Sequence, residues 1–299
     1  MDTCTELFQK HRSRLLGLAY RMLGTQADAE DVLHDAWLRW HAQDKGHLDD
    51  PEAWLVTVTT RLALDRLRHA KVERERYTGP WLPEPLVTPE EQPDTQAEQA
   101  ETLTLSFLLM LERLSPEERA AFLLREVFDY SHAEAAAILG ITEESCRQRA
   151  HRAKQRLREE RARFTASAPT QRRLLERFAH ALQRPTEENL RALFAEDAIL
   201  ISDGGGIVTA ALRPLLGGER ITRLYLQVAK HERTHDVLRS MHTLNGAPAL
   251  LTWVDGQLST AFWIECDSDR IVAVHALRNP EKLARLAAVT KWPGGTSLH

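Results

Sequence analysis

The pattern of apolar and polar positions between residues 115 and 163 has a helical period and predicts three helices with distinct ends. The first two helices each begin with a capping-box sequence, a serine followed three residues later by a glutamate, which satisfies free amide groups of the first turn. These pairs are Ser115 with Glu118 and Ser131 with Glu134. Gly140 can adopt the left-handed conformation that ends the second helix, and Thr142 can cap the third. Two helices joined by such a tight turn form a helix-turn-helix, whose second helix fits the major groove of DNA.

The last of these helices has two chemically different faces. One face is a stripe of small apolar residues suited to packing on the preceding helix, namely Cys146, Ala150, Ala153 and Leu157. From residue 145 to residue 163 the chain has eight lysines or arginines and two glutamates, although the whole chain carries a net charge of −4. Positive charge concentrated on one helix is what neutralisation of DNA phosphates requires. The alternative is an ordinary solvated, arginine-rich helix end.

Composition limits the class of protein. A chain of 299 residues with 43% hydrophobic residues is long enough for two or three domains with cores of their own. A calculated pI near 6.4 argues against a histone-like protein that coats any nucleic acid. The cysteines are three in number and far apart, which predicts neither a disulfide framework nor a zinc site; they are Cys4, Cys146 and Cys266.

The start of the chain lacks the basic residues and apolar run of a signal peptide, and no apolar run approaches the length of a membrane span. We therefore expect a cytoplasmic protein without a membrane partner.

Changes of composition divide the chain. We expect a helical domain over 1–75, an acidic, proline-rich linker over 76–100, and a second helical domain over 101–165 that contains the helix-turn-helix. A mixed domain over 170–290 and a tail over 291–299 follow. In the first domain, Gly24 ends the first helix, Thr25 caps the second, and Asp50 caps a long third helix with basic residues in its second half.

Three strings carry a family resemblance. FQKHRSRLLGLAYRMLGTQADAEDVLHDAWLRW, DPEAWLVTVTTRLALDRLRHAK and LSPEERAAFLLREVFDYSHAEAAAILG resemble an extracytoplasmic-function sigma factor of the sigma-70 family. The resemblance covers region 2 at about 8–75 and region 4 at about 104–163. The motifs WLPEPL, DGGG and NPEKL are similar to those of the subgroup with a fused SnoaL-like C-terminal domain.

The resemblance implies roles for individual residues. The face expected to dock on core RNA polymerase is Asp31, His34, Asp35 and Arg39. Residues expected at the −10 element, where melted DNA needs phosphate pairing and base stacking, are His47, Asp49, Trp54, Arg61 and Arg66. Residues expected at the −35 element are Ser145, Arg147, Gln148, Arg149 and Arg152. Trp54 serves equally well as a core residue, and the sequence does not apportion base and phosphate contacts among the arginines.

The resemblance also implies regulatory contacts through the three motifs of the subgroup. These contacts are expected at Trp81, Leu82, Pro83, Asp203, Gly204, Gly205, Gly206, Asn279 and Pro280. Asp203 to Gly206 lacks the Lys and Ser or Thr of a phosphate-binding loop, so we interpret it as a glycine turn or a point of close backbone approach.

The last third of the chain reads as helices followed by strands. Thr186 caps a helix expected over 188–198, strands follow, and residues 217–231 form an amphipathic helix. Asp255-Gly256 predicts a two-residue hairpin between two later strands. This order predicts an α+β cone of the SnoaL-like, nuclear transport factor 2-like type behind two all-α domains.

The cone offers weak signals of chemistry. His231 to His235 matches the H-E-x-x-H zinc pattern, but the helix is expected to end near His231, so we predict no metal site. Polar or aromatic residues that could line a pocket are Asp203, His242, Trp253 and His275, although core or surface roles are more common for such residues.

The sequence thus predicts an RNA polymerase sigma factor that binds core polymerase and directs promoter-specific initiation through the −10 and −35 elements. Its activity is expected to be modulated by its own SnoaL-like domain. We expect no enzymatic activity and no cofactor, and leave open a small-molecule ligand of the cone. Competing hypotheses are a bifunctional protein whose cone senses or converts a small molecule, and a helix-turn-helix repressor. The acidic helix and the basic third helix disfavour a repressor.

Overall fold

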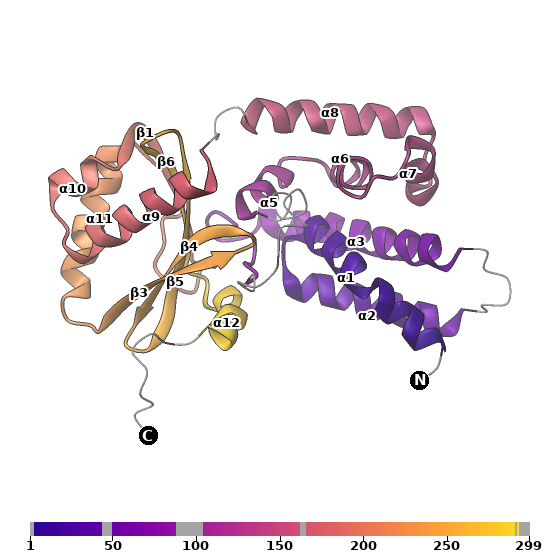
Figure 1. Cartoon of the computed structure of the whole chain (residues 1–299), viewed down its shortest axis with the longest axis horizontal. Helices are drawn as coiled ribbons and strands as arrows, with labels where there is room; N and C mark the ends of the chain where they lie inside the picture. Colours follow the sequence, from indigo (N-terminus) through magenta and orange to yellow (C-terminus); the bar gives the residue numbers. More distant parts are fainter. Residues whose placement is uncertain (1–2, 44–49, 88–103, 162–165, 291, 293–299) are drawn as a thin grey trace, which may run out of the picture. The chain divides into compact units, whose positions relative to one another are not determined.

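The computed structural model describes residues 3–43, 50–87, 104–161, 166–290 and 292. The chain divides into two compact units, residues 1–76 with 107–160 and residues 77–106 with 161–299 (Figure 1). Three sets of predicted residues lie outside the described part of the chain: His47 and Asp49, residues 88–100 of the expected linker, and nearly all of the expected tail. No helix in the described part is long and apolar enough to cross a membrane.

The first unit begins with α1 (Thr3–Leu23), α2 (Gln26–Ala42) and α3 (Pro51–Glu75). Two predicted caps are confirmed, because the Thr25 and Asp50 side chains accept hydrogen bonds from the backbone amides of Asp28 and Ala53. The apolar faces of the three helices meet in a core that includes fully buried residues such as Leu15, Met22, Trp40, Leu55 and Leu67.

The same unit continues with α5 (Leu105–Leu111), α6 (Pro116–Phe122), the π-helical turn η2 (Leu123–Val127), α7 (His132–Leu139) and α8 (Glu143–Arg161). Only the last five residues of α5 belong to this unit. Both predicted capping boxes are present, Gly140 has a φ of 66°, and the Thr142 hydroxyl accepts from the Ser145 amide at 3.2 Å. The helix-turn-helix of α7 and α8 is therefore confirmed. The π-helical turn was not predicted.

The second unit contains a curved six-stranded sheet with the order β2-β1-β6-β5-β4-β3. Its strands are β1 (Phe194–Asp203), β2 (Leu215–Leu216), β3 (Val237–Leu244), β4 (Ala247–Val254), β5 (Gln257–Cys266) and β6 (Ile271–Leu277). The pairing of β1 with β6 is parallel, and the other pairings are antiparallel. The predicted hairpin is confirmed, since Asp255 and Gly256 have φ values of 50° and 79° between β4 and β5.

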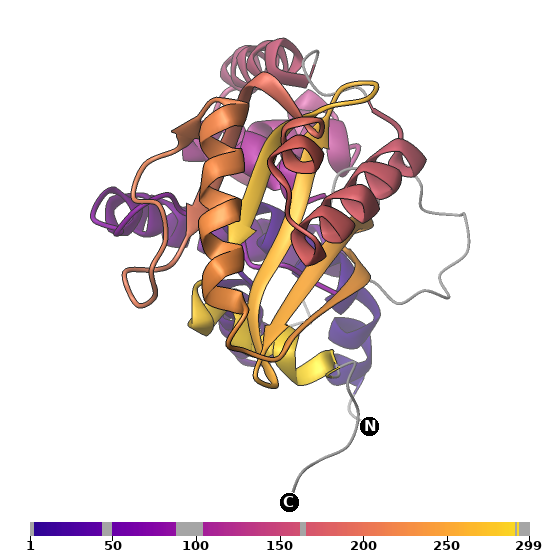
Figure 2. The ribbon, with the colours of Figure 1, turned by 90° about the vertical axis from the view of Figure 1, so that its left-hand side faces the viewer.

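The helices of this unit are α9 (Ala168–Gln183), α10 (Glu187–Arg191), α11 (Gly218–Glu232) and α12 (Pro280–Val289). Figure 2 shows α9 and α11 across one face of the sheet. On that face Phe178, Tyr225 and Phe262 pack edge to face, with ring centroids 5.1 to 6.4 Å apart. Helices over one face of a curled sheet give the predicted SnoaL-like α+β cone.

The prediction of a helix over 188–198 was wrong. The helix ends at Arg191 and β1 begins at Phe194. Phe194 pairs with Ile271 of β6 and is buried in the aromatic core, so a partner strand far along the chain overrides the local helical pattern.

Candidate functional site

The residues predicted to dock on polymerase form one exposed face of α2. Asp31, His34, Asp35 and Arg39 are all exposed, whereas Val32, Leu33, Ala36 and Trp40 are buried on the other face. Their spacing of three, four and eight residues from the first brings them together on the helix surface. Leu38, with 53% of its surface exposed, lies in the same stretch of α2.

Of the residues predicted for the −10 element, Trp54, Arg61 and Arg66 are described, and all three lie on α3 with partners within the chain. The guanidinium of Arg66 donates through two nitrogens to Oδ1 of Asp28, at 2.9 and 2.7 Å, and these hydrogen bonds raise the pKa of Arg66. Trp54 is half-buried, with its ring 5.6 Å from that of Trp40, so it belongs partly to the core.

Arg61 contacts the helix-turn-helix. Its Nε donates to the carbonyl of Ile138 at 3.0 Å, and an Nη donates to the carbonyl of Ala137 at 3.4 Å. Both carbonyls belong to the last turn of α7, where unpaired carbonyl groups and the helix dipole favour a cation. A side chain predicted to hold promoter DNA is thus occupied inside the unit.

Further contacts join α3 to the helices before α7. Arg68 pairs with Glu117 at 3.0 Å, and the Lys71 ammonium donates to the carbonyl of Leu114 at 2.6 Å. Arg74 pairs with Glu112. The basic second half of α3 therefore binds α6 and the turn between α5 and α6.

Arg119 of α6 is the most deeply buried of these cations, with 1% of its side chain exposed. It donates to the carbonyls of Met22 at 2.7 Å and Leu111 at 3.0 Å and to the carboxylate of Glu112 at 2.6 Å. Burial opposes ionisation of Glu112, but Arg119 and Arg74 outweigh it and hold the pKa of Glu112 below its ordinary value. This network fixes α1, α5 and α6 to one another.

Helix α8 presents the predicted −35 surface. The stripe of Cys146, Ala150, Ala153 and Leu157 is buried as expected. Opposite it, Arg147, Gln148 and Arg152 are exposed, and Ser145 and Arg149 are half-buried. Arg147 pairs with the exposed carboxylate of Glu143 at 2.7 Å, whereas Arg152 lies 3.4 Å from the buried carboxylate of Glu118. The exposed pair of Arg147 with Glu143 is weak and can exchange for a phosphate contact.

A second site lies in the other unit, where the residues of the three motifs converge on Asp203. This carboxylate, at the end of β1, has no exposed surface. It accepts hydrogen bonds from the Tyr77 hydroxyl at 2.6 Å, the Leu82 amide at 2.9 Å and the Gly205 amide at 3.0 Å, and it pairs with Lys282 at 2.7 Å. We call residues 77–87 the linker segment, and Asp203 with its partners in the folded domain the linker site.

Residues at the start of α12 complete the linker site. The Asn279 amide donates to the Tyr77 hydroxyl at 2.8 Å, and the Lys282 ammonium donates to the carbonyl of Leu82 at 2.6 Å. That ammonium also lies 4.3 Å from the ring centroid of Trp81. Burial, followed by the hydrogen bond to Asp203, raises the pKa of Tyr77, so the phenol stays a donor.

The far end of the linker segment is held by the β3–β4 turn. The backbone amide of Leu86 donates to the side-chain Oδ1 of Asn245 at 2.7 Å, and the backbone amide of Asn245 donates to the Leu86 carbonyl at 2.8 Å. Val87 forms a β-bridge with Leu244. The segment is thus bonded at both ends to one folded domain.

The glycines of the DGGG motif are matched to this contact. A Cβ on Gly205 would lie 2.4 Å from Nδ2 of Asn279, and one on Gly206 would lie 3.0 Å from Cβ of Thr78. Both glycines also have positive φ, of 65° and 72°. The turn therefore permits close approach of the linker segment and α12.

The structure brings together most of the predicted regulatory residues. Leu82 and Pro83 are buried, Trp81 is half-buried over Lys282, and Pro280 is exposed at the start of α12. Sequence reasoning missed Tyr77, Asn245 and Lys282. Lys282 lies in the NPEKL motif, but nothing local marks Tyr77 or Asn245 as partners of residues more than 120 positions away.

The H-E-x-x-H match and the suggested pocket residues of the cone do not form a site together. Helix α11 ends at Glu232, His235 pairs with Asp255 at 2.6 Å, and the described residues contain no cluster of three or more potential metal ligands. The cone holds a cavity of about 650 Å³, but Asp203, His242, Trp253 and His275 are not among its lining residues. His275 instead pairs with Glu265 at 3.1 Å.

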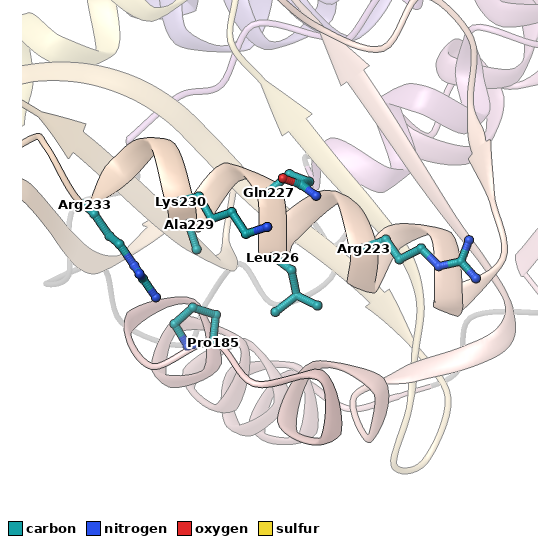
Figure 3. A pocket seen from close by; sticks show the side chains of 7 residues that line it. All are labelled: Pro185, Arg223, Leu226, Gln227, Ala229, Lys230 and Arg233. Carbon is teal, nitrogen blue, oxygen red and sulfur yellow. The ribbon is translucent and has the colours of Figure 1, made fainter.

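A smaller groove of about 290 Å³ follows the outer side of α11 (Figure 3). Pro185 and three basic side chains lie along it, and Figure 3 shows Arg233 extending toward Pro185 while Arg223 extends away from it. Arg223 is exposed and pairs with Glu219 one turn before it. The groove has the character of a solvated surface.

Comparison with known proteins agrees with this arrangement. Residues 7–72 match the family model of Sigma-70 region 2, and residues 104–157 match that of Sigma-70 region 4. The chain is 37% identical over 222 residues to the ECF RNA polymerase sigma factor SigJ of Mycobacterium tuberculosis, covering 73% of this chain and 71% of SigJ. It is 30% identical over 292 residues to the probable ECF RNA polymerase sigma factor SigI of the same organism, covering 96% and 97% of the two chains.

Among solved structures, the crystal structure of Mycobacterium tuberculosis extracytoplasmic function sigma factor SigJ has a TM-score of 0.73 and 30% sequence identity. The similarity covers 94% of this chain and 98% of that one, so it extends over the cone as well as the helical regions.

Proposed function

Because the chain belongs to the extracytoplasmic-function group of sigma-70 family RNA polymerase sigma factors, we propose that its C-terminal domain restrains promoter recognition by holding the linker segment. As a sigma factor the chain acts with core RNA polymerase and promoter DNA. The C-terminal domain here means residues 166–290, region 2 means 7–72 and region 4 means 104–157. The proposal concerns how that established activity is controlled.

The observation that carries the proposal is the buried carboxylate of Asp203. A fully buried charge is stable only when it is paired and hydrogen-bonded, and three of the groups that meet this need belong to the linker segment or bind it directly: Tyr77, Leu82 and Lys282. Release of the linker segment would leave Asp203 and Lys282 with fewer partners. The contact is therefore strong enough to compete with other uses of the linker.

The covalent connections explain how such a contact would act. Tyr77 directly follows Arg76, the C-cap residue of α3, and only residues 162–165 separate α8 from the first described residue of the C-terminal domain. While the linker segment is bound, region 2 and region 4 are each connected through only a few residues of chain to the same folded domain. The distance by which they can separate is then limited, whereas a promoter requires them to reach two elements at once.

The occupied side chains of region 2 support a restrained state. Arg61 is bonded to the last turn of α7, and Arg68 is paired with Glu117 of α6. We infer that these contacts exchange for DNA when regions 2 and 4 move apart, and that the linker site opposes this exchange. The exposed face of α2 and the basic face of α8 stay accessible for polymerase and for the −35 element, respectively.

Hydrogen exchange of the linker segment tests the proposal. In the free chain the Leu82 and Leu86 amides are hydrogen-bonded, so peptides covering 77–87 should exchange slowly, and they should exchange faster once core polymerase and promoter DNA are added. Asp203→Asn should accelerate exchange in the free chain. Asp197→Asn, an exposed position on the same strand, should not.

Protection of 77–87 that is unchanged in the transcription complex would contradict release of the linker segment. Equal exchange in the two asparagine variants would contradict the assignment of Asp203 as its anchor.

A further inference from the structure

The cavity of the C-terminal domain has the size and lining of a small-molecule site. Its volume of about 650 Å³ lies within the range of roughly 300–1,000 Å³ typical of ligand pockets. Much of the lining is apolar and comes from α9, α11 and the helix-facing side of the sheet, with Leu182, Leu200, Leu224, Val228, Val254 and Phe262. The cavity belongs to neither the linker site nor the surfaces of regions 2 and 4.

Three buried polar atoms on this lining have no hydrogen-bond partner among the described residues. They are the Tyr225 hydroxyl, Nε of Arg239 and the Thr252 hydroxyl. Tyr225 and Thr252 are 4% and 3% exposed, and the side chain of Arg239 is 6% exposed. Leaving a buried polar group unpaired destabilises the folded state, so three such groups around one cavity indicate a place for the polar group of a ligand.

The charges of the lining favour an anion. Arg239 donates to the Glu232 carboxylate at 2.5 Å, and Arg278 donates to the carbonyl of Thr209. The lining thus contains two arginines and one carboxylate, so Arg239, Arg278 and Glu232 together carry one positive charge. His231 and His235 also line the cavity, and His235 is paired with Asp255. Burial raises the pKa of Tyr225, so its phenol is a neutral donor.

We propose that this cavity binds an apolar monocarboxylate of the fatty-acid or aryl-acid class, with its carboxylate at Tyr225 and Arg239 and its hydrocarbon part against the apolar lining. A carboxylate accepts the hydrogen bonds that the Tyr225 hydroxyl and Nε of Arg239 leave unmade, and it neutralises the excess positive charge. A phosphate ester carries more charge than the single excess cation offsets. A neutral hydrocarbon leaves the donors unpaired. Binding of such an acid does not depend on whether the domain regulates transcription.

The groove outside α11 provides an internal control. Arg233 lies on that groove and not on the cavity, although it is only six residues before Arg239. Arg233→Met and Arg239→Met therefore remove the same charge from the same part of the chain, one outside and one inside the proposed site.

Isothermal titration of the full-length chain with decanoate and phenylacetate, each beside its matched neutral alcohol, tests the site. We expect at least one acid to bind to the folded chain at submillimolar concentration, about tenfold or more tighter than its alcohol, because only the acid neutralises the cationic end. Arg239→Met should weaken binding of that acid about tenfold or more, and Arg233→Met should leave it within about twofold.

Tyr225→Phe is a second test that remains valid if Arg239→Met does not fold, since it removes only a hydroxyl that has no partner among the described residues. It should weaken acid binding about threefold to tenfold while circular dichroism stays unchanged. The proposal is overturned if neither acid binds the folded chain below millimolar concentration, if acid and alcohol bind equally, or if Tyr225→Phe retains full affinity.

Discussion

Asp203 illustrates how one residue can connect a folded domain to a segment of chain far from it in sequence. Its carboxylate has no exposed surface, and the Tyr77 hydroxyl that it binds is 126 residues away. Removing one partner from a buried, hydrogen-bonded charge pair costs about 3–5 kcal/mol, far more than an exposed ion pair contributes. The linker site therefore concentrates much of its binding energy in Asp203 and Lys282.

Glu112 has a comparable role in the other unit and leads to a pH prediction. Its pKa is lowered in the folded chain, so its contribution to the free energy of unfolding is complete above the ordinary value of 4.5 and is lost as the pH falls through the folded pKa. Urea unfolding of the unit between pH 7 and pH 3, monitored by hydrogen exchange in α3 peptides, should show this decrease in the free energy of unfolding. Glu112→Gln should lower stability at pH 7 and flatten the dependence on pH, whereas an unchanged slope would contradict the role assigned to the Arg119–Glu112 pair.

At the level of elements, α8 carries the prediction for DNA recognition. Arg149→Ala should weaken binding to −35 DNA by about 1–3 kcal/mol if the side chain reads a base. If the side chain contacts a phosphate, the slope of the logarithm of the binding constant against the logarithm of the salt concentration should fall by about one. Arg158→Ala, an exposed position farther along the same helix, is the matched control. Fluorescence anisotropy at several salt concentrations measures both quantities. An Arg149→Ala chain with wild-type affinity and salt slope would remove Arg149 from the DNA surface.

Helix α2 carries the prediction for polymerase binding. Asp31→Ala with Asp35→Ala should weaken association with core polymerase, because both carboxylates are exposed and neither supports the core face of the helix. Glu73→Ala with Glu75→Ala removes two exposed acids from α3 and serves as the control. A quantitative pull-down with core polymerase measures the difference. If both double variants bind alike while melting temperatures stay unchanged, the docking surface lies elsewhere.

The elements themselves were largely predictable, because their signals are local. Ser115, Ser131 and Gly140 each act within four residues of their own position, and Asp255-Gly256 specifies its hairpin alone. The helix expected over 188–198 failed for the opposite reason, since Phe194 belongs to a strand whose partner, Ile271, is remote in sequence.

At the scale of the molecule, contacts between distant segments determine how the surfaces are used, and these could not be predicted. Arg61 was assigned to DNA through the family resemblance, but its bond to the Ile138 carbonyl spans 77 residues. The predicted cavity residues, such as His275, fell on strand positions outside the cavity, while Tyr225 and Arg239 gave no sequence signal. The motifs around Asp203 were recognised by family resemblance, and only the structure joins them to Tyr77 and Asn245.

Through these long-range contacts we expect the linker site to restrain a sigma factor whose regions 2 and 4 are otherwise competent for promoter recognition. Breaking the site should therefore raise transcription without changing binding to core polymerase. Asp203→Asn is the most selective change, because it keeps the shape of the side chain and removes the charge that Lys282 neutralises. Asp197→Asn on the same strand is its control.

The most direct measurement is in vitro transcription of sheared genomic DNA from the encoding organism, with 5′-end sequencing of the products. Core polymerase is supplied in turn with the wild-type chain, Asp203→Asn and Asp197→Asn. We expect several-fold more promoter-specific starts with Asp203→Asn than with the wild type, at the same start sites, and wild-type levels with Asp197→Asn. Equal or fewer starts with Asp203→Asn, at equal occupancy of core polymerase, would contradict the restraint.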